Sequence, residues 1–200
     1  PGRFGGEPAM AQGPLGFLKL FAAWGAEVAV LIDWARRQGS GSVALGGVSL
    51  GALTSQLTAV AARDWPAELR PDALLLIASS QDLKEVAFNG SLATAIGLPA
   101  RLEAEGWTEA DIERYLPLME PRGGPVMAPE KIVMALGEAD DLTPFEGGLA
   151  LARRWQVPPA NLFLRRQGHF TVALDLARRP QPLDRLAEVL GNPAGLLRMR

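Results

Sequence analysis

The most informative stretch of the sequence is residues 42–51, SVALGGVSLG. Residues 42–48 form a short apolar run bounded by Gly and Ser, which is typical of a buried β-strand. A second apolar run follows directly over residues 50–63, and its spacing favours a helix. The sequence therefore predicts a strand, a sharp turn at Ser49 and a helix, in that order.

Similar apolar runs recur along the chain, and helical segments lie between them. Because strand and helix alternate from residue 42 onward, we predict an α/β fold with a mostly parallel sheet and helices on both faces. Residues 1–16 are rich in Gly and Pro and are predicted to be loop. The predicted strands are 42–48, 72–78, 131–136 and 161–165, and the predicted helices are 17–37, 50–63, 147–155, 171–179 and 182–190.

Residues 81–128 interrupt this alternation. They separate the second and third predicted strands by more residues than a simple crossover helix needs. Thr108 followed by Asp111 is typical of the capping pair that begins a helix. The segment is either an ordinary helical insertion packed on the sheet or a helical cap over a functional site. We favour the cap, because long insertions at strand ends often serve as lids.

The composition indicates a single globular domain over residues 1–200. The chain is 48% hydrophobic with a formal net charge of −2, which argues against disorder and against a nucleic-acid-binding surface. The absence of cysteine excludes disulfides and thiolate metal sites, and a single histidine excludes a histidine-rich zinc site. We therefore expect no metal and no organic cofactor.

The most apolar stretch is residues 17–34, which Lys19, Glu27 and Asp33 interrupt. It falls short of the roughly 20 apolar residues that a bilayer crossing requires, so we predict no transmembrane segment. No signal peptide is visible at the start of the sequence. These features favour a soluble, cytoplasmic protein.

Residues 47–51 have the pattern G-x-S-x-G at the predicted turn from strand to helix. In a nucleophile elbow this pattern holds the serine in a strained turn, where larger flanking side chains would clash. A serine hydroxyl becomes an effective nucleophile only when a base takes its proton. The only histidine, His169, follows the fourth predicted strand in a predicted loop and is the candidate base.

A histidine base needs a carboxylate that fixes its tautomer and stabilises the imidazolium. The loop after the third predicted strand offers three acids, Glu138, Asp140 and Asp141. Because burying several acids together is costly, we expect one of them to point inward and the others to face solvent.

These motifs resemble those of the α/β-hydrolase superfamily, in which the serine, the acid and the histidine follow one another in this order. The pattern G-x-x-D-x-x-x-P at residues 137–144 is similar to the acid loop of that superfamily, and it selects Asp140 over Asp141. The tripeptide Gly168-His169-Phe170 is similar to its histidine loop. The resemblance extends over about residues 15–190.

The resemblance implies a serine hydrolase that cleaves an ester or a related acyl bond of a small molecule without a cofactor. Ser49 would attack the carbonyl, His169 would accept the proton, Asp140 would orient His169, and the Leu50 backbone N–H would bind the oxyanion. An acyltransferase or a peptidase using the same triad is the alternative enzyme, and a non-catalytic hydrolase-like binding domain is the alternative from another class.

The N-terminal part departs from this family pattern. Members usually have several strands before the elbow, and a second oxyanion donor follows one of them. Only 48 residues precede Ser49, and they are predicted to be loop and one helix. Gly5-Gly6 is a faint counterpart of a glycine-rich oxyanion loop. We therefore expect a fragment or an unusually short member, with its second oxyanion donor unidentified.

Overall fold

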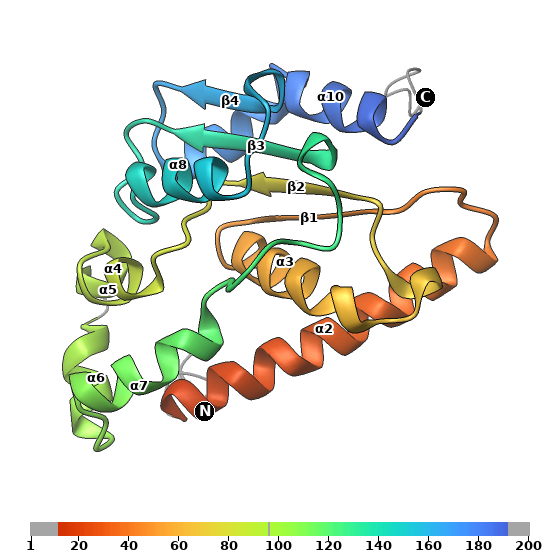
Figure 1. Ribbon diagram of the computed structural model, residues 1–200. Coiled ribbons are helices and arrows are strands. Elements are labelled where there is room, and N and C mark those ends of the chain that lie inside the picture. Colours follow the sequence, from red (N-terminus) through yellow and green to blue (C-terminus); the bar gives the residue numbers. More distant parts are fainter. Residues whose placement is uncertain (1–11, 96, 192–200) are drawn as a thin grey trace.

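The computed structural model describes residues 12–95 and 97–191. Within them, a four-stranded parallel sheet has the order β1-β2-β3-β4 (Figure 1). Each strand lies within two residues of its predicted position, and the predicted parallel α/β sheet is confirmed. The strands are β1 (Ala44–Val48), β2 (Ala73–Ile77), β3 (Ile132–Gly137) and β4 (Leu162–Arg165).

Helices cover both faces of the sheet, as predicted. Side chains alternate between the faces along a strand, so an entirely apolar strand can bury both sides. On one face, Leu74, Leu76 and Met134 pack with Ala52 and Leu151. These last two residues belong to α3 (Leu50–Ala61) and α8 (Phe145–Arg154).

The opposite face packs against the C-terminal helices. Leu75, Ile77 and Val133 contact Val172 and Leu186 there. These two helices are α9 (His169–Leu174) and α10 (Gln181–Val189). The buried β2 and β3 are therefore the centre of the fold, and their carboxyl ends lie at the same end of the sheet. Short 3₁₀ turns complete the chain: η1 (Ala62–Asp64), η2 (Ala67–Leu69), η3 (Pro129–Lys131), η4 (Pro159–Asn161) and η5 (Asp175–Ala177).

The N-terminal helix α2 (Gly13–Arg37) begins four residues earlier than predicted. The prediction of loop over residues 13–16 is therefore wrong, whereas residues 1–11 lie outside the described part of the chain. Pro14 is suited to the first turn of a helix, where its missing N–H has no intrahelical acceptor. A Cβ at Gly13 would lie 2.2 Å from the indole nitrogen of Trp107, so the helix starts where this distant ring packs closely against its backbone.

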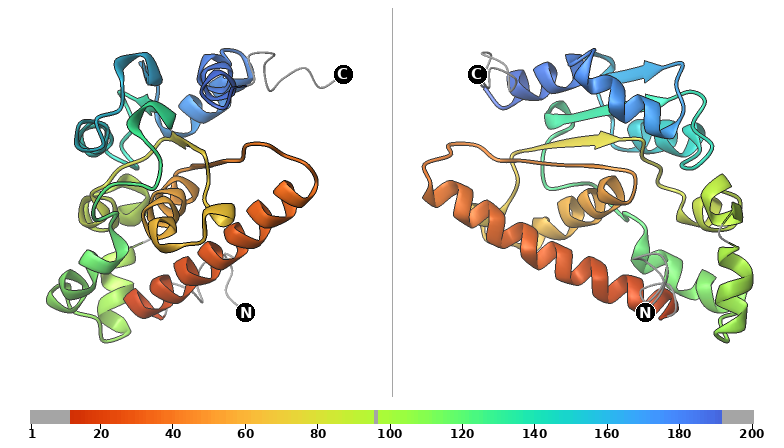
Figure 2. Two further views of the ribbon diagram at one scale, coloured as in Figure 1. Left: turned by 45° about the vertical axis from the view of Figure 1, so that its right-hand side comes forward. Right: turned by 180° about the vertical axis from the view of Figure 1, so that it is seen from behind.

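Helix α2 is long and apolar enough to cross a membrane when only length and composition are considered. Core helices of soluble proteins and signal sequences pass this same test. We expected residues 17–34 to miss this requirement, whereas α2, which begins at Gly13, meets it by this criterion. Figures 1 and 2 show α2 lying along α3, on the far side of α3 from α10.

The segment inserted between β2 and β3 is helical. Thr108 and Asp111 form the predicted capping box, with each side chain accepting a hydrogen bond from the other residue's backbone N–H. Its apolar side chains, among them Leu102 and Ile112, pack against Phe21 of α2 and Leu53 of α3. The helices of the insertion therefore pack on α2 and α3, and its role as a cap stays a prediction. Its helices are α4 (Leu83–Phe88), α5 (Ser91–Ala95), α6 (Leu98–Ala104) and α7 (Glu109–Met119) (Figure 1).

Candidate active site

Ser49 occupies the sharp turn between β1 and α3. Its φ of 55° and ψ of −119° lie in a region that residues other than glycine rarely adopt. Its backbone N–H donates to the carbonyl of Ile77 at 3.0 Å, and its carbonyl accepts from the N–H of Leu53 at 3.0 Å. These bonds tie the strained residue to the neighbouring strand and to the first turn of α3, as expected for a nucleophile elbow.

The elbow requires a glycine at position 47 but not at position 51. A Cβ on Gly47 would lie 2.2 Å from the carbonyl carbon and oxygen of Gly51, whereas nothing lies within 4 Å of a Cβ on Gly51. We predict that Gly47→Ala lowers the free energy of unfolding by about 1–3 kcal/mol, because the backbone must shift. Gly51→Ala should raise it by about 0.5–1 kcal/mol, because Ala is the better helix former.

Urea unfolding of the two glycine variants beside the parent protein checks this prediction. Equal losses of stability in both variants would show that the tight contact at position 47 does not constrain the elbow.

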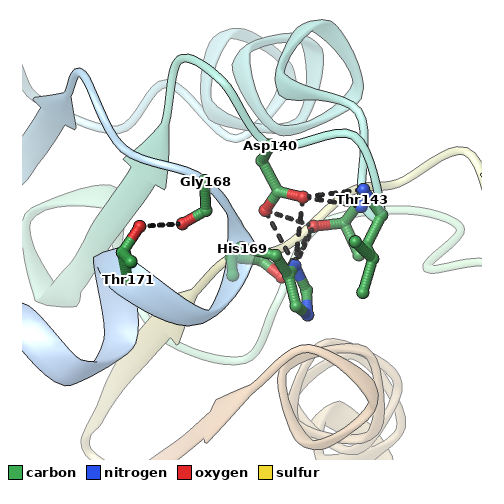
Figure 3. Close-up of polar contacts among 7 residues, drawn as sticks. Asp140, Thr143, Gly168, His169 and Thr171 are labelled. Carbon is green, nitrogen blue, oxygen red and sulfur yellow. Dashed lines mark hydrogen bonds and ion pairs between the residues drawn. The ribbon is translucent and has the colours of Figure 1, made fainter. Parts of the chain in front are cut away.

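Asp140 and His169 lie together at the carboxyl ends of β3 and β4 (Figure 3). His169 Nδ1 is 2.9 Å from Asp140 Oδ2 and 3.1 Å from Oδ1, and both side chains are buried. His169 is the first residue of α9, so its predicted place in a loop is wrong. Helix α9 begins two residues earlier than predicted, because the chain already turns at Gly168.

The acid loop and the histidine loop lie directly against each other. The N–H of Glu138 donates to the carbonyl of Arg165 at 2.7 Å, and the N–H of Ala139 donates to the carbonyl of Gln167 at 3.0 Å. A Cβ on Gly137 would lie 2.4 Å from that Gln167 carbonyl oxygen, so the crossing of the two loops needs glycine there. This close backbone pairing sets the separation between Asp140 and His169.

Asp140 is well supplied with hydrogen-bond donors. Its Oδ1 accepts from the backbone N–H groups of Leu142 at 3.0 Å and Thr143 at 2.9 Å. Burial alone would raise the pKa of Asp140, but the hydrogen bonds from His169 and Thr143 outweigh it and hold this pKa below its usual value. Asp141 is exposed, and Glu138 lies 3.9 Å from Arg166. Asp140 is thus the acid of this loop that contacts His169.

The depressed pKa of Asp140 makes folding stability depend on pH. A carboxyl whose pKa is lower in the folded state stabilises the fold above its unfolded pKa, about 4, and this stabilisation is lost as the pH falls through the folded pKa. We expect the free energy of unfolding to decline below about pH 4 more steeply in the parent protein than in Asp140→Asn. Urea unfolding at a series of pH values measures both slopes, and equal slopes in the two proteins would contradict this expectation.

Ser49 and His169 follow strands at opposite edges of the four-stranded sheet. Among the described residues, no hydrogen bond joins the Ser49 hydroxyl to His169. In serine sites such a bond often tightens only when substrate is bound. The loops carrying the base and the acid reach back toward β2, where the Thr143 hydroxyl donates to the Ala78 carbonyl at 3.0 Å.

The Leu50 N–H, the predicted oxyanion donor, belongs to the first residue of α3. Backbone N–H groups of a first helical turn have no acceptor within the helix and are free to bind an anion. Gly5-Gly6 lies outside the described residues. Over residues 12–95 and 97–191, no group of three or more potential metal-ligating side chains comes together.

The sequence analysis did not predict a role for Thr143. Its hydroxyl lies 2.9 Å from Asp140 Oδ2 and 3.2 Å from His169 Nδ1 (Figure 3). The available signal was a threonine three positions after the aspartate, a spacing that allows local side-chain hydrogen bonds. The contact with the Ala78 carbonyl joins residues far apart in the chain, and the sequence pattern offers no sign of it.

The chain matches one family model and is similar to a solved crystal structure. The model of the family described as alpha/beta hydrolase domain containing 18 matches residues 17–102, which include Ser49 but neither Asp140 nor His169. The crystal structure of Zea mays acyl-protein thioesterase 2 is similar at a TM-score of 0.40 and 18% identity, covering 83% of this chain and 62% of that chain. This chain therefore spans less than two thirds of that protein. None of the curated proteins matches the sequence.

Proposed function

Because this chain belongs to the α/β-hydrolase superfamily, we propose that it is a serine hydrolase that cleaves an ester or a related acyl bond of a small molecule. The observation that carries the proposal is the buried Asp140–His169 hydrogen bond, at the same carboxyl end of the sheet as the strained Ser49. A buried histidine paired with a carboxylate, beside a serine at an elbow, is the arrangement that activates a hydroxyl.

In the proposed reaction, Ser49 Oγ attacks the carbonyl carbon while His169 Nε2 accepts the hydroxyl proton. Asp140 keeps the other imidazole proton on Nδ1 and stabilises the imidazolium. The Leu50 N–H donates to the developing oxyanion. When the tetrahedral intermediate collapses, His169 gives its proton to the leaving alcohol. A water molecule then releases the acyl group from Ser49 by the same steps.

Exposed apolar side chains beside the reacting residues support an acyl substrate. Leu50 follows Ser49 and is 44% exposed, and Phe170 follows His169 and is 67% exposed. Sites that bind acyl groups combine apolar side chains with a few polar groups. In the proposed complex, these two side chains would contact the hydrocarbon part of the acyl group.

Turnover of p-nitrophenyl esters with acyl chains of increasing length tests the proposal. The parent protein should hydrolyse at least one of them, and Ser49→Ala should lose that turnover. Ser55→Ala is a matched control: this serine lies in α3, and its hydroxyl donates to the Gly51 carbonyl at 2.8 Å. Ester hydrolysis that persists in Ser49→Ala would overturn the proposal. So would a parent protein that hydrolyses the esters no faster than Ser49→Ala does.

A further inference from the structure

A single hydroxyl, that of Thr143, lies within hydrogen-bonding distance of three groups at the candidate site. Asp140 Oδ2 is 2.9 Å away, the Ala78 carbonyl oxygen 3.0 Å and His169 Nδ1 3.2 Å. The Thr143 backbone N–H also donates to Asp140 Oδ1 at 2.9 Å. Thr143 therefore contacts both members of the Asp140–His169 pair and also Ala78, the residue that follows β2.

The chemistry of the three neighbouring groups decides which of them can donate a proton to this hydroxyl and which can only accept one. A threonine hydroxyl has one proton to give and two lone pairs that accept. The carboxylate of Asp140 and the carbonyl of Ala78 can only accept, so they compete for that proton. A protonated His169 Nδ1 can only donate, and the lone pairs of Thr143 Oγ1 can accept from it. The hydroxyl thus serves as a second acceptor for the Nδ1 proton beside Asp140.

The contact with Ala78 ties this pair to the neighbourhood of the nucleophile. Ala78 directly follows β2, the strand paired with β1, and its N–H donates to the Ala135 carbonyl at 3.0 Å. The preceding carbonyl, that of Ile77, accepts from the Ser49 N–H at 3.0 Å. Two successive carbonyls at the end of β2 therefore anchor the elbow and, through Thr143, the acid loop.

We propose that Thr143 is a positioning residue: its hydroxyl holds the Asp140–His169 pair in place relative to the end of β2 and thereby relative to Ser49. It touches no reacting atom of the proposed hydrolysis, and it acts by keeping His169 in the Nδ1–H tautomer with the ring correctly placed. Losing the hydroxyl leaves the Ala78 carbonyl without this donor and gives the imidazole more freedom to move.

Nuclear magnetic resonance of the imidazole tests this role without any assay of activity. His169 is the only histidine, so its ring ¹⁵N and Nδ1–H signals need no further assignment. We expect Thr143→Val to shift the Nδ1 signals and to broaden or abolish the Nδ1–H resonance. Thr143→Ser should restore the parent spectrum. Thr171→Val is the matched control, since the Thr171 hydroxyl donates to the Gly168 carbonyl at 3.0 Å, and it should leave the spectrum unchanged (Figure 3).

The kinetic consequence rests on the proposed hydrolase function. Thr143→Val should lower kcat about tenfold with KM changed less than about twofold, because a hydrogen bond to a charged pair is lost while substrate contacts remain. If Thr143→Val does not fold, Thr143→Ala carries the same test. Imidazole signals and kcat unchanged in a folded Val or Ala variant would overturn the positioning role. Shifted signals in a protein that hydrolyses no ester would uphold it and refute the hydrolase instead.

Discussion

His169→Ala is expected to lose ester turnover by about 10⁴–10⁶-fold, because it removes the base on which the proposed chemistry depends. The chain contains no second imidazole that could accept the Ser49 proton. Without a base, the hydroxyl remains a weak nucleophile at neutral pH. The comparison to make is kcat/KM of the variant and the parent protein on the same ester.

Folding of the His169 variant is checked separately, because the ring is only 5% exposed and its removal leaves a space in the protein. A far-ultraviolet circular dichroism spectrum that matches the parent separates loss of chemistry from loss of structure. A folded His169→Ala variant with near-parent turnover would rule out a histidine base.

Asp140→Asn is expected to lower kcat by up to about 10⁴-fold. The amide keeps the shape of the side chain, but its NH₂ group can face Nδ1 and hold the imidazole in the wrong tautomer. A ring with its proton on Nε2 cannot accept the Ser49 proton there. Asp140 is buried and lies 2.9 Å from His169. No other acid of this loop can therefore take its place.

Asp141→Asn is the matched control, because it makes the same chemical change at the next residue. The Asp141 side chain is exposed, and its backbone carbonyl accepts from the Ser91 N–H at 3.1 Å. This variant should keep turnover within about twofold of the parent, as surface substitutions usually do. A crippled Asp141→Asn beside a mild Asp140→Asn would reverse the assignment of the acid.

The positions of the strands could be predicted closely because each strand is specified by residues that are adjacent in the sequence. Residues 73–77 and 132–137 are buried along their whole length, so the requirement for apolar residues at every position leaves a clear pattern. The elbow is equally local, since its strained serine and the crowded Gly47 lie within one short motif. The spacing of the acid loop likewise selected Asp140, the acid that contacts His169.

What the sequence did not reveal depends on contacts between distant parts of the chain. Helix α2 begins at Gly13, where Trp107 packs closely against its backbone, and a Gly- and Pro-rich stretch has no periodicity that predicts this. His169 starts a helix rather than lying in a loop. Thr143 stood inside the predicted acid loop, but its link to Ala78 becomes visible only when the loop is placed beside β2.

Covalent labelling with a fluorophosphonate, followed by mass spectrometry of the peptide that contains Ser49, tests the central claim most directly. Such probes react with a serine hydroxyl whose proton is taken by a neighbouring base. We predict an adduct on Ser49 in the parent protein and in Ser55→Ala, and none in Ser49→Ala. Labelling should also be far slower in His169→Ala and Asp140→Asn. No adduct on Ser49 in the folded parent protein, or an adduct that forms equally fast without His169, would contradict the account.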